Sequence, residues 1–102
     1  MIDINYELYK VFYHVASTLN FSEASKRLFI SQSAVSQSIK TLERKLDQTL
    51  FIRSTKKVQL TPEGEILMRH IEPAMNLIHK GETQLLDAAS TGGQIRIGAS
   101  DT

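Results

Sequence analysis

A chain of 102 residues, 41% of them hydrophobic, is long enough for one small domain and an appendage, and a domain of this size gains from oligomerisation. The absence of cysteine excludes a disulfide framework and a thiolate metal site. No apolar run reaches the roughly 20 residues of a membrane helix, and Asp3, Glu7 and Lys10 argue against a signal peptide. We therefore expect a cytoplasmic protein.

The net charge of +1 conceals an uneven distribution along the chain. Up to Thr61 there are 9 Lys and Arg against 5 Asp and Glu, a net charge of +4, whereas the rest has 3 against 6, a net charge of −3. This division predicts that the N-terminal part meets a polyanion and the C-terminal part does not. Chance clustering of charges on solvated faces is the alternative.

The first helix is predicted over residues 4–17, where apolar residues recur at spacings of three and four and form one stripe. Rings on its flanks could make a stacking platform for bases, but half-buried core edges with wet polar tips are the favoured interpretation. The stripe is Leu8, Val11, Phe12, Val15 and Leu19, and the flanking residues are Tyr6, Tyr9, Tyr13 and His14.

A short second helix is predicted over residues 23–28. We expect Asn20 to take the positive φ that ends the first helix, because Asn tolerates that conformation. Ser22 is expected to cap the second helix, and Glu23 adds favourable charge at its start.

A third helix is predicted over residues 32–46, after a three-residue turn. Ser31 provides its N-cap, and Ile30 can reach Val35 as a hydrophobic staple. Two adjacent caps, a short helix, a tight turn and a stapled helix together predict a helix-turn-helix. The buried stripe of the third helix is Val35, Ile39, Leu42 and Leu46.

The outward face at the start of the third helix carries hydrogen-bonding side chains and no carboxylate. Glutamine can make two hydrogen bonds to adenine, serine can serve several bases, and lysine can reach guanine or phosphate. An ordinary solvated helix face is the alternative. The predicted base-reading residues are Gln32, Ser33, Ser36, Gln37 and Lys40.

Strand-like segments at residues 50–53 and 58–60, joined by a polar turn, predict a small β-hairpin or wing. Its cations are suited to phosphates beside the groove, which give affinity without sequence information. The predicted contacts to the DNA backbone are Ser31, Arg53, Lys56, Lys57 and Thr61.

A long helix is predicted over residues 62–89, with Thr61 as its cap and Pro62 at its first position. At 1.5 Å per residue it would span roughly 40 Å, so it cannot bury its apolar seam on one small domain. Pro73 and Gly81 weaken the seam. We expect a homodimer built on Leu67, Ile71, Ala74, Ile78 and Leu85, and the alternative is a helix that folds back on its own core.

Residues 90–102 are predicted to form a flexible hinge, rich in small residues, and an alternating strand over 94–99. The expected division is thus a DNA-binding domain over residues 1–61, a dimerisation helix over 62–89 and, from residue 90, the beginning of a further domain. The histidines at 70 and 79 are not spaced as an i, i+4 metal pair.

Three ordered blocks of this chain resemble the N-terminal DNA-binding region of the LysR-type transcription regulators. NFSEASKRLFISQSAVSQSIKTLERKL resembles the family's helix-turn-helix signature, LFIRSTKKVQLTPEG its wing and following cap, and GGQIRIGAS the entry into its effector-binding domain. The resemblance implies a bacterial dimer with paired linker helices that binds an interrupted palindrome in double-stranded DNA. Full-length proteins of the family often form tetramers, and the small-molecule effector is expected only on the absent C-terminal domain.

The resemblance places Gln32, Ser33, Ser36 and Gln37 at positions that meet bases or nearby phosphates, and Arg53 and Thr61 at positions that meet the DNA backbone. The family often has glycine where Asn20 stands, proline where Ser33 stands and arginine where Gln37 stands. Gln37 removes a charged contact and shifts the expected base preference from guanine towards adenine.

The sequence therefore predicts a mainly α-helical fold, a winged helix-turn-helix followed by a long dimerisation helix, that regulates transcription without catalysis and needs no cofactor in this chain. A helical protein-protein interaction module is the alternative function. No nucleophile with a base, carboxylate pair or metal cluster supports an enzyme.

Overall fold

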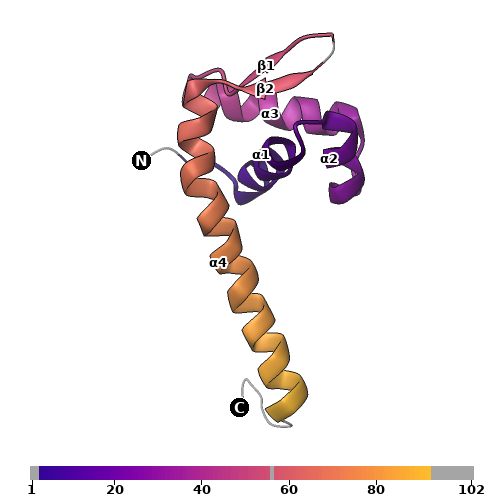
Figure 1. Cartoon of the computed structure of the whole chain (residues 1–102), viewed down its shortest axis with the longest axis vertical. Helices are drawn as coiled ribbons and strands as arrows, with labels where there is room; N and C mark the ends of the chain where they lie inside the picture. Colours follow the sequence, from indigo (N-terminus) through magenta and orange to yellow (C-terminus); the bar gives the residue numbers. More distant parts are fainter. Residues whose placement is uncertain (1–2, 56, 93–102) are drawn as a thin grey trace. The chain divides into compact units, whose positions relative to one another are not determined.

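The computed structural model describes residues 3–55 and 57–92 and is mainly helical (Figure 1). Three helices precede a two-stranded antiparallel wing, and a long helix follows it, which confirms the predicted winged helix-turn-helix. The elements are α1 (Tyr6–Thr18), α2 (Phe21–Leu28), α3 (Gln32–Leu46), β1 (Phe51–Arg53), β2 (Val58–Leu60) and α4 (Pro62–Gly92). No helix in the described part of the chain is long and apolar enough to span a membrane.

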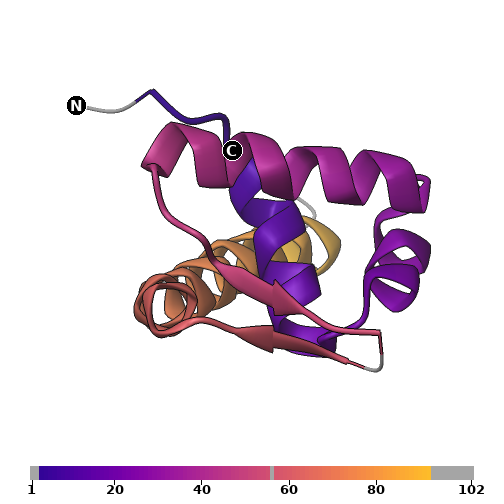
Figure 2. The same cartoon turned by 90° about the horizontal axis from the view of Figure 1, so that it is seen from above.

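The chain divides into two units, residues 1–72 and 73–102, and the first contains the hydrophobic core. In this unit α1 packs against both α2 and α3 (Figure 2). The rings of Phe12 on α1 and Phe51 on β1 are 5.4 Å apart and join the wing to the helices. Fully buried Phe12, Val15, Val35, Ile39 and Leu42 confirm most of the core stripes predicted for the first and third helices, whereas Leu19, predicted in the first stripe, is 43% exposed.

The start of α2 differs from the prediction. Leu19 takes the left-handed conformation that ends α1, with φ of 52°, and Asn20 is extended. The Asn20 Oδ1 accepts a hydrogen bond from the Glu23 amide at 2.9 Å, so Asn20 caps a helix that begins at Phe21, two residues earlier than expected. Asn and Ser are nearly equal as N-caps, which explains why Ser22 was the wrong choice.

Thr61 fastens the wing to α4. Its hydroxyl donates to the Thr49 carbonyl oxygen at 2.6 Å and accepts from the Gly64 amide at 2.9 Å. Its own amide donates to the Leu50 carbonyl oxygen at 3.0 Å. A side chain on Gly64 would collide with that same Leu50 oxygen, which explains why glycine stands in the first turn of α4.

The residues from Pro73 to Gly92 continue α4, and Pro73 lies inside the helix without ending it. The helix extends three residues beyond the predicted end, so the hinge expected from residue 90 is wrong for residues 90–92. The strand predicted over residues 94–99 lies outside the described residues.

Candidate nucleic-acid interface

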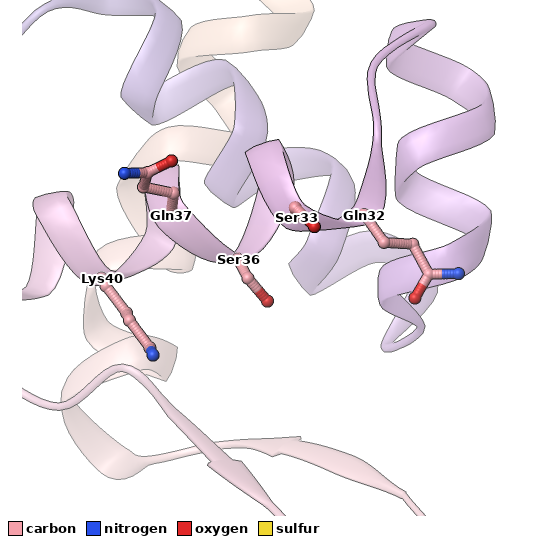
Figure 3. Close-up of a pocket in the computed structure, with 5 residues that line it drawn as sticks. All are labelled: Gln32, Ser33, Ser36, Gln37 and Lys40. Atoms are coloured by element: carbon pink, nitrogen blue, oxygen red, sulfur yellow. The ribbon is translucent and has the colours of Figure 1, made fainter.

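The N-terminal half of α3 forms an open polar surface in the first unit. The Ser31 Oγ accepts a hydrogen bond from the Ala34 amide at 3.1 Å, which confirms the predicted cap and fixes where α3 begins. The five predicted base-reading residues line one hollow of about 560 Å³ (Figure 3): Gln32, Ser33, Ser36, Gln37 and Lys40.

Side chains on this surface spread around the helix rather than along a single line. Figure 3 shows the amide of Gln37 on one side of α3 and the tips of Ser36 and Lys40 on the other. Ser36 is half-buried, and the other four residues are exposed. The surface thus combines donors and acceptors with one cation and no carboxylate, a composition suited to base edges between walls of phosphate.

Arg53 is held in place by an aromatic ring that no sequence pattern links to the site. Its guanidinium carbon lies 4.1 Å from the centroid of the Phe21 ring, at the start of α2. The Phe21 ring in turn meets Phe51 edge-on, with 6.2 Å between centroids. A cation over an aromatic face is stabilised by the ring quadrupole, so the exposed Arg53 keeps its charge at a defined position. Phe21 and Arg53 lie too far apart in sequence for any local pattern to pair them.

Glu43 joins the wing to α3. Its Oε2 accepts hydrogen bonds from the amides of Leu50 at 2.8 Å and Phe51 at 3.3 Å, directly where β1 begins. Hydrogen bonds to an ionised acceptor are stronger than those between neutral groups. This contact was also missed, because a glutamate late in an amphipathic helix is usually a solvated residue.

The remaining predicted phosphate contacts differ in their availability. Ser31 is exposed and uses its oxygen as a cap acceptor, which leaves its hydroxyl proton for another acceptor. Lys57 is exposed in the wing, and Lys56 lies outside the described residues. The Thr61 side chain is not available for the predicted contact, because only 6% of the residue is exposed and both functions of its hydroxyl are used within the fold.

The dimerisation residues predicted on α4 also divide into two groups. Leu67 and Ile71 are half-buried against the core of their own unit, so only part of each side chain is available to a partner helix. Ala74, Ile78 and Leu85 are exposed. Two further leucines of this part of the helix, Leu77 and Leu86, are 67% and 70% exposed. No group of three histidine, cysteine or acidic residues could hold a metal ion within the described ranges 3–55 and 57–92.

The fold and this surface define a winged helix-turn-helix DNA-binding protein. A family model described as "Bacterial regulatory helix-turn-helix protein, lysR family" matches residues 6–65. The chain belongs to this family, whose members are DNA-binding transcriptional regulators and not enzymes.

Sequence relatives are named as regulators of this type. The HTH-type transcriptional regulator YofA of Bacillus velezensis is 34% identical over 93 residues, which cover 91% of this chain and 32% of YofA. The HTH-type transcriptional regulator GltR of Bacillus subtilis is 31% identical over 99 residues, which cover 97% of this chain and 33% of GltR. The chain therefore spans about a third of the length of these relatives.

Solved structures resemble the chain in fold. The oxidized form of OxyR from Corynebacterium glutamicum superposes with a TM-score of 0.73 and 30% identity, over 78% of this chain and 26% of OxyR. A structure described as a CbnR DBD–DNA complex gives a TM-score of 0.70 and 27% identity, over 84% of this chain and 99% of that one.

Proposed function

We propose that the chain binds double-stranded DNA sequence-specifically, as the DNA-binding region of a cytoplasmic transcriptional regulator. The observation that carries the proposal is the exposed face of α3, which holds polar groups and a lysine but no carboxylate. The solved CbnR DBD–DNA complex, of similar fold, supports the proposal.

Base recognition is assigned to the α3 surface. The amides of Gln32 and Gln37 can each pair with an adenine edge, and the serines and Lys40 add single hydrogen bonds. Contacts to the DNA backbone are assigned to Ser31, Arg53, Lys56 and Lys57. These groups give affinity and salt dependence but no sequence preference.

The chain is proposed to act as a homodimer on an interrupted palindrome. From Pro73 onwards α4 exposes Leu77, Ile78, Leu85 and Leu86, between 43% and 74% of each residue, and no other described element of this unit can cover them. Apolar side chains of this number on one helix are stabilised by burial against a second helix. A palindromic operator follows from the twofold symmetry of such a dimer.

The first unit also contains an apolar pocket. It has a volume of about 270 Å³ and lies between the end of α3 and the start of α4, where Leu46, Leu50 and Ile66 contribute to its lining. Ile66 is 52% exposed.

Since relatives are about three times as long as this chain, a tetramer and a small-molecule effector are proposed only for a full-length protein.

Selection of bound sequences from random duplex DNA tests the proposal. We expect an enriched palindrome with two half-sites, whose affinity falls steeply with salt concentration. Binding without enrichment would contradict sequence specificity, and the absence of salt-dependent binding to duplex DNA would favour a protein interaction module.

The assignment of Gln37 is tested on the selected operator. Replacing Gln37 with Ala should weaken operator binding by about 1 to 3 kcal/mol and relax the preference at one base pair. The measurement is titration of the operator and of a scrambled duplex with both proteins. An equal loss on the two duplexes would remove Gln37 from the base-reading set.

A further inference from the structure

Phe29, in the turn between α2 and α3, is not explained by the stability of the fold. It is 93% exposed, more than any other large apolar residue in the described part of the chain. Its φ is 58°, in the left-handed region that bulky side chains rarely adopt. An exposed ring adds no buried apolar area to stabilise the fold, and a positive φ at a bulky residue lowers the stability of the folded state. Folding alone would favour another residue here.

The backbone conformation itself is required by the turn. The Phe29 amide donates to the Lys26 carbonyl oxygen at 3.3 Å, and the Ile30 amide donates to the Ser25 carbonyl oxygen at 3.2 Å. Closing a helix in this way needs a left-handed residue, for which Gly and Asn are the usual choices. At the corresponding position the chain has Asp47 after α3, with a φ of 55°, and Leu19 after α1, with a φ of 52°. Leu19 is 43% exposed, against 93% for Phe29. The phenyl ring is thus the unusual feature, and the turn is not.

The position of Phe29 in the chain points to DNA as the partner of its ring. Phe29 precedes Gln32 by three residues, so the two Cα atoms are at most about 11 Å apart. The major groove is about 12 Å wide. When Gln32 reaches base edges, the Phe29 backbone therefore lies within one groove width of them, and deoxyribose rings and thymine methyl groups are the apolar surfaces in that range.

The charges around Phe29 favour the same partner. Lys26 and Arg27, in the last turn of α2, are exposed, and the neutral polar residues Ser31 and Gln32 follow the turn. Ile30, 39% exposed, is the adjacent apolar residue. A protein-docking patch usually spans several hundred Å² of apolar surface, whereas this small apolar site with cations beside it suits a surface that mixes apolar groups with phosphates.

We propose that Phe29 is a DNA-contacting residue whose ring packs against a deoxyribose or a thymine methyl group beside the base that Gln32 reads. This inference rests on the proposed function, because it requires the start of α3 to enter the major groove. It adds an apolar contact to a surface that otherwise recognises DNA through hydrogen bonds and charge.

The test uses a substitution that suits the backbone. Asn adopts positive φ more readily than Phe, so Phe29→Asn should keep or raise the thermal midpoint of unfolding. On the selected operator the same variant should bind about tenfold more weakly. Phe29→Tyr retains the ring and should bind like the parent chain. Replacing thymine with uracil in the operator distinguishes the two apolar surfaces. If the ring contacts the methyl group, the parent chain no longer binds more tightly than Phe29→Asn. If the ring contacts a sugar, the difference in affinity persists.

The outcomes separate this inference from the proposed function. If the parent chain prefers the operator but Phe29→Asn binds it equally well, Phe29 does not contact DNA and the inference is wrong, while the proposed function stands. A ring that serves only a protein partner would give that result. If the parent chain shows no operator preference, the proposed function fails first.

Discussion

The two units of this chain contrast in how they treat their apolar residues. In residues 3–72 the side chains of three helices and the wing bury one another around Phe12, Ile39 and Leu42. From Pro73 to residue 88 the helix exposes every side chain except the half-buried Met75. An isolated helix of this length is marginally stable in water. The first unit thus contains its own stabilising contacts, whereas the second leaves its apolar side chains exposed, as the proposed dimer would explain.

The largest expected effect on stability comes from adding one methyl group to a glycine of the first unit. Gly64→Ala places a carbon against the Leu50 carbonyl oxygen and within 2.8 Å of the Leu60 side chain. This should lower the free energy of unfolding by about 3 kcal/mol. Gly81→Ala is the matched control, because nothing lies within 4 Å of the added carbon. In a dilute, monomeric sample it should favour the helix by about 1 kcal/mol. Urea unfolding of both variants checks the difference, and equal losses would contradict it.

The next effect concerns the second unit. Leu85, 74% exposed, should become buried in the dimer, so Leu85→Ala should weaken dimerisation by about 2 kcal/mol, or roughly 30-fold. Analytical ultracentrifugation over a concentration series measures the change. Thr83→Ala is the control, since Thr83 lies about 200° around the helix from Leu85. A dissociation constant unchanged by Leu85→Ala would show that this helix is not the dimer interface.

A smaller effect is expected at the aromatic support of Arg53. Replacing Phe21 with Leu keeps apolar volume but removes the ring face, and should weaken DNA binding by about 1 kcal/mol. Arg53→Ala should weaken binding to all duplexes and reduce the salt slope by about one. Because both substitutions act through the same contact, the loss of DNA affinity in the double variant should be smaller than the sum of the two single losses. Phe21→Tyr should retain affinity. Strict additivity would mean that Phe21 does not position Arg53.

The smallest effect is a pH dependence within the first unit. Burial, together with the charges of Arg27 and Lys10, lowers the pKa of His14 below its ordinary 6.5. Its Nδ1 is buried and has no hydrogen-bond partner. The unfolded chain therefore binds this proton more readily, and stability should decrease as the pH falls through about 6.5. His14→Gln should flatten the dependence of unfolding free energy on pH between about 7 and 5. Parallel curves for the two proteins would contradict this.

Sequence signals were sufficient where the structure depends on neighbours in the chain. The cap at Ser31, the start of α4 after Thr61 and the stripe of Val35, Ile39 and Leu42 all follow from spacings of a few residues. The position of the wing follows from two short apolar runs around a polar turn. The exposed surface of α3 was therefore predictable in full as a set of residues, although its contacts with DNA stay a prediction.

Long-range contacts were not predictable in this way. Nothing local distinguishes Leu67, which packs on the first unit, from Leu85, which is exposed, because both fit the same heptad-like spacing. The support of Arg53 by Phe21 and the wing contacts of Glu43 bring together residues that no local pattern links. The shift of the α2 cap to Asn20 reflects a choice between two residues of nearly equal capping preference.

The Glu43 contact has a consequence for how DNA is bound. Because one carboxylate on α3 holds two consecutive amides at the start of β1, the base-reading helix and the wing form a preorganised pair before DNA arrives. Less conformational entropy is then lost on binding. If α3 and Arg53 contact DNA as proposed, the protein sets the spacing between the base and the phosphate that they meet. We therefore expect operators whose twist or groove width departs from that spacing to bind more weakly, so that DNA shape as well as base identity affects binding.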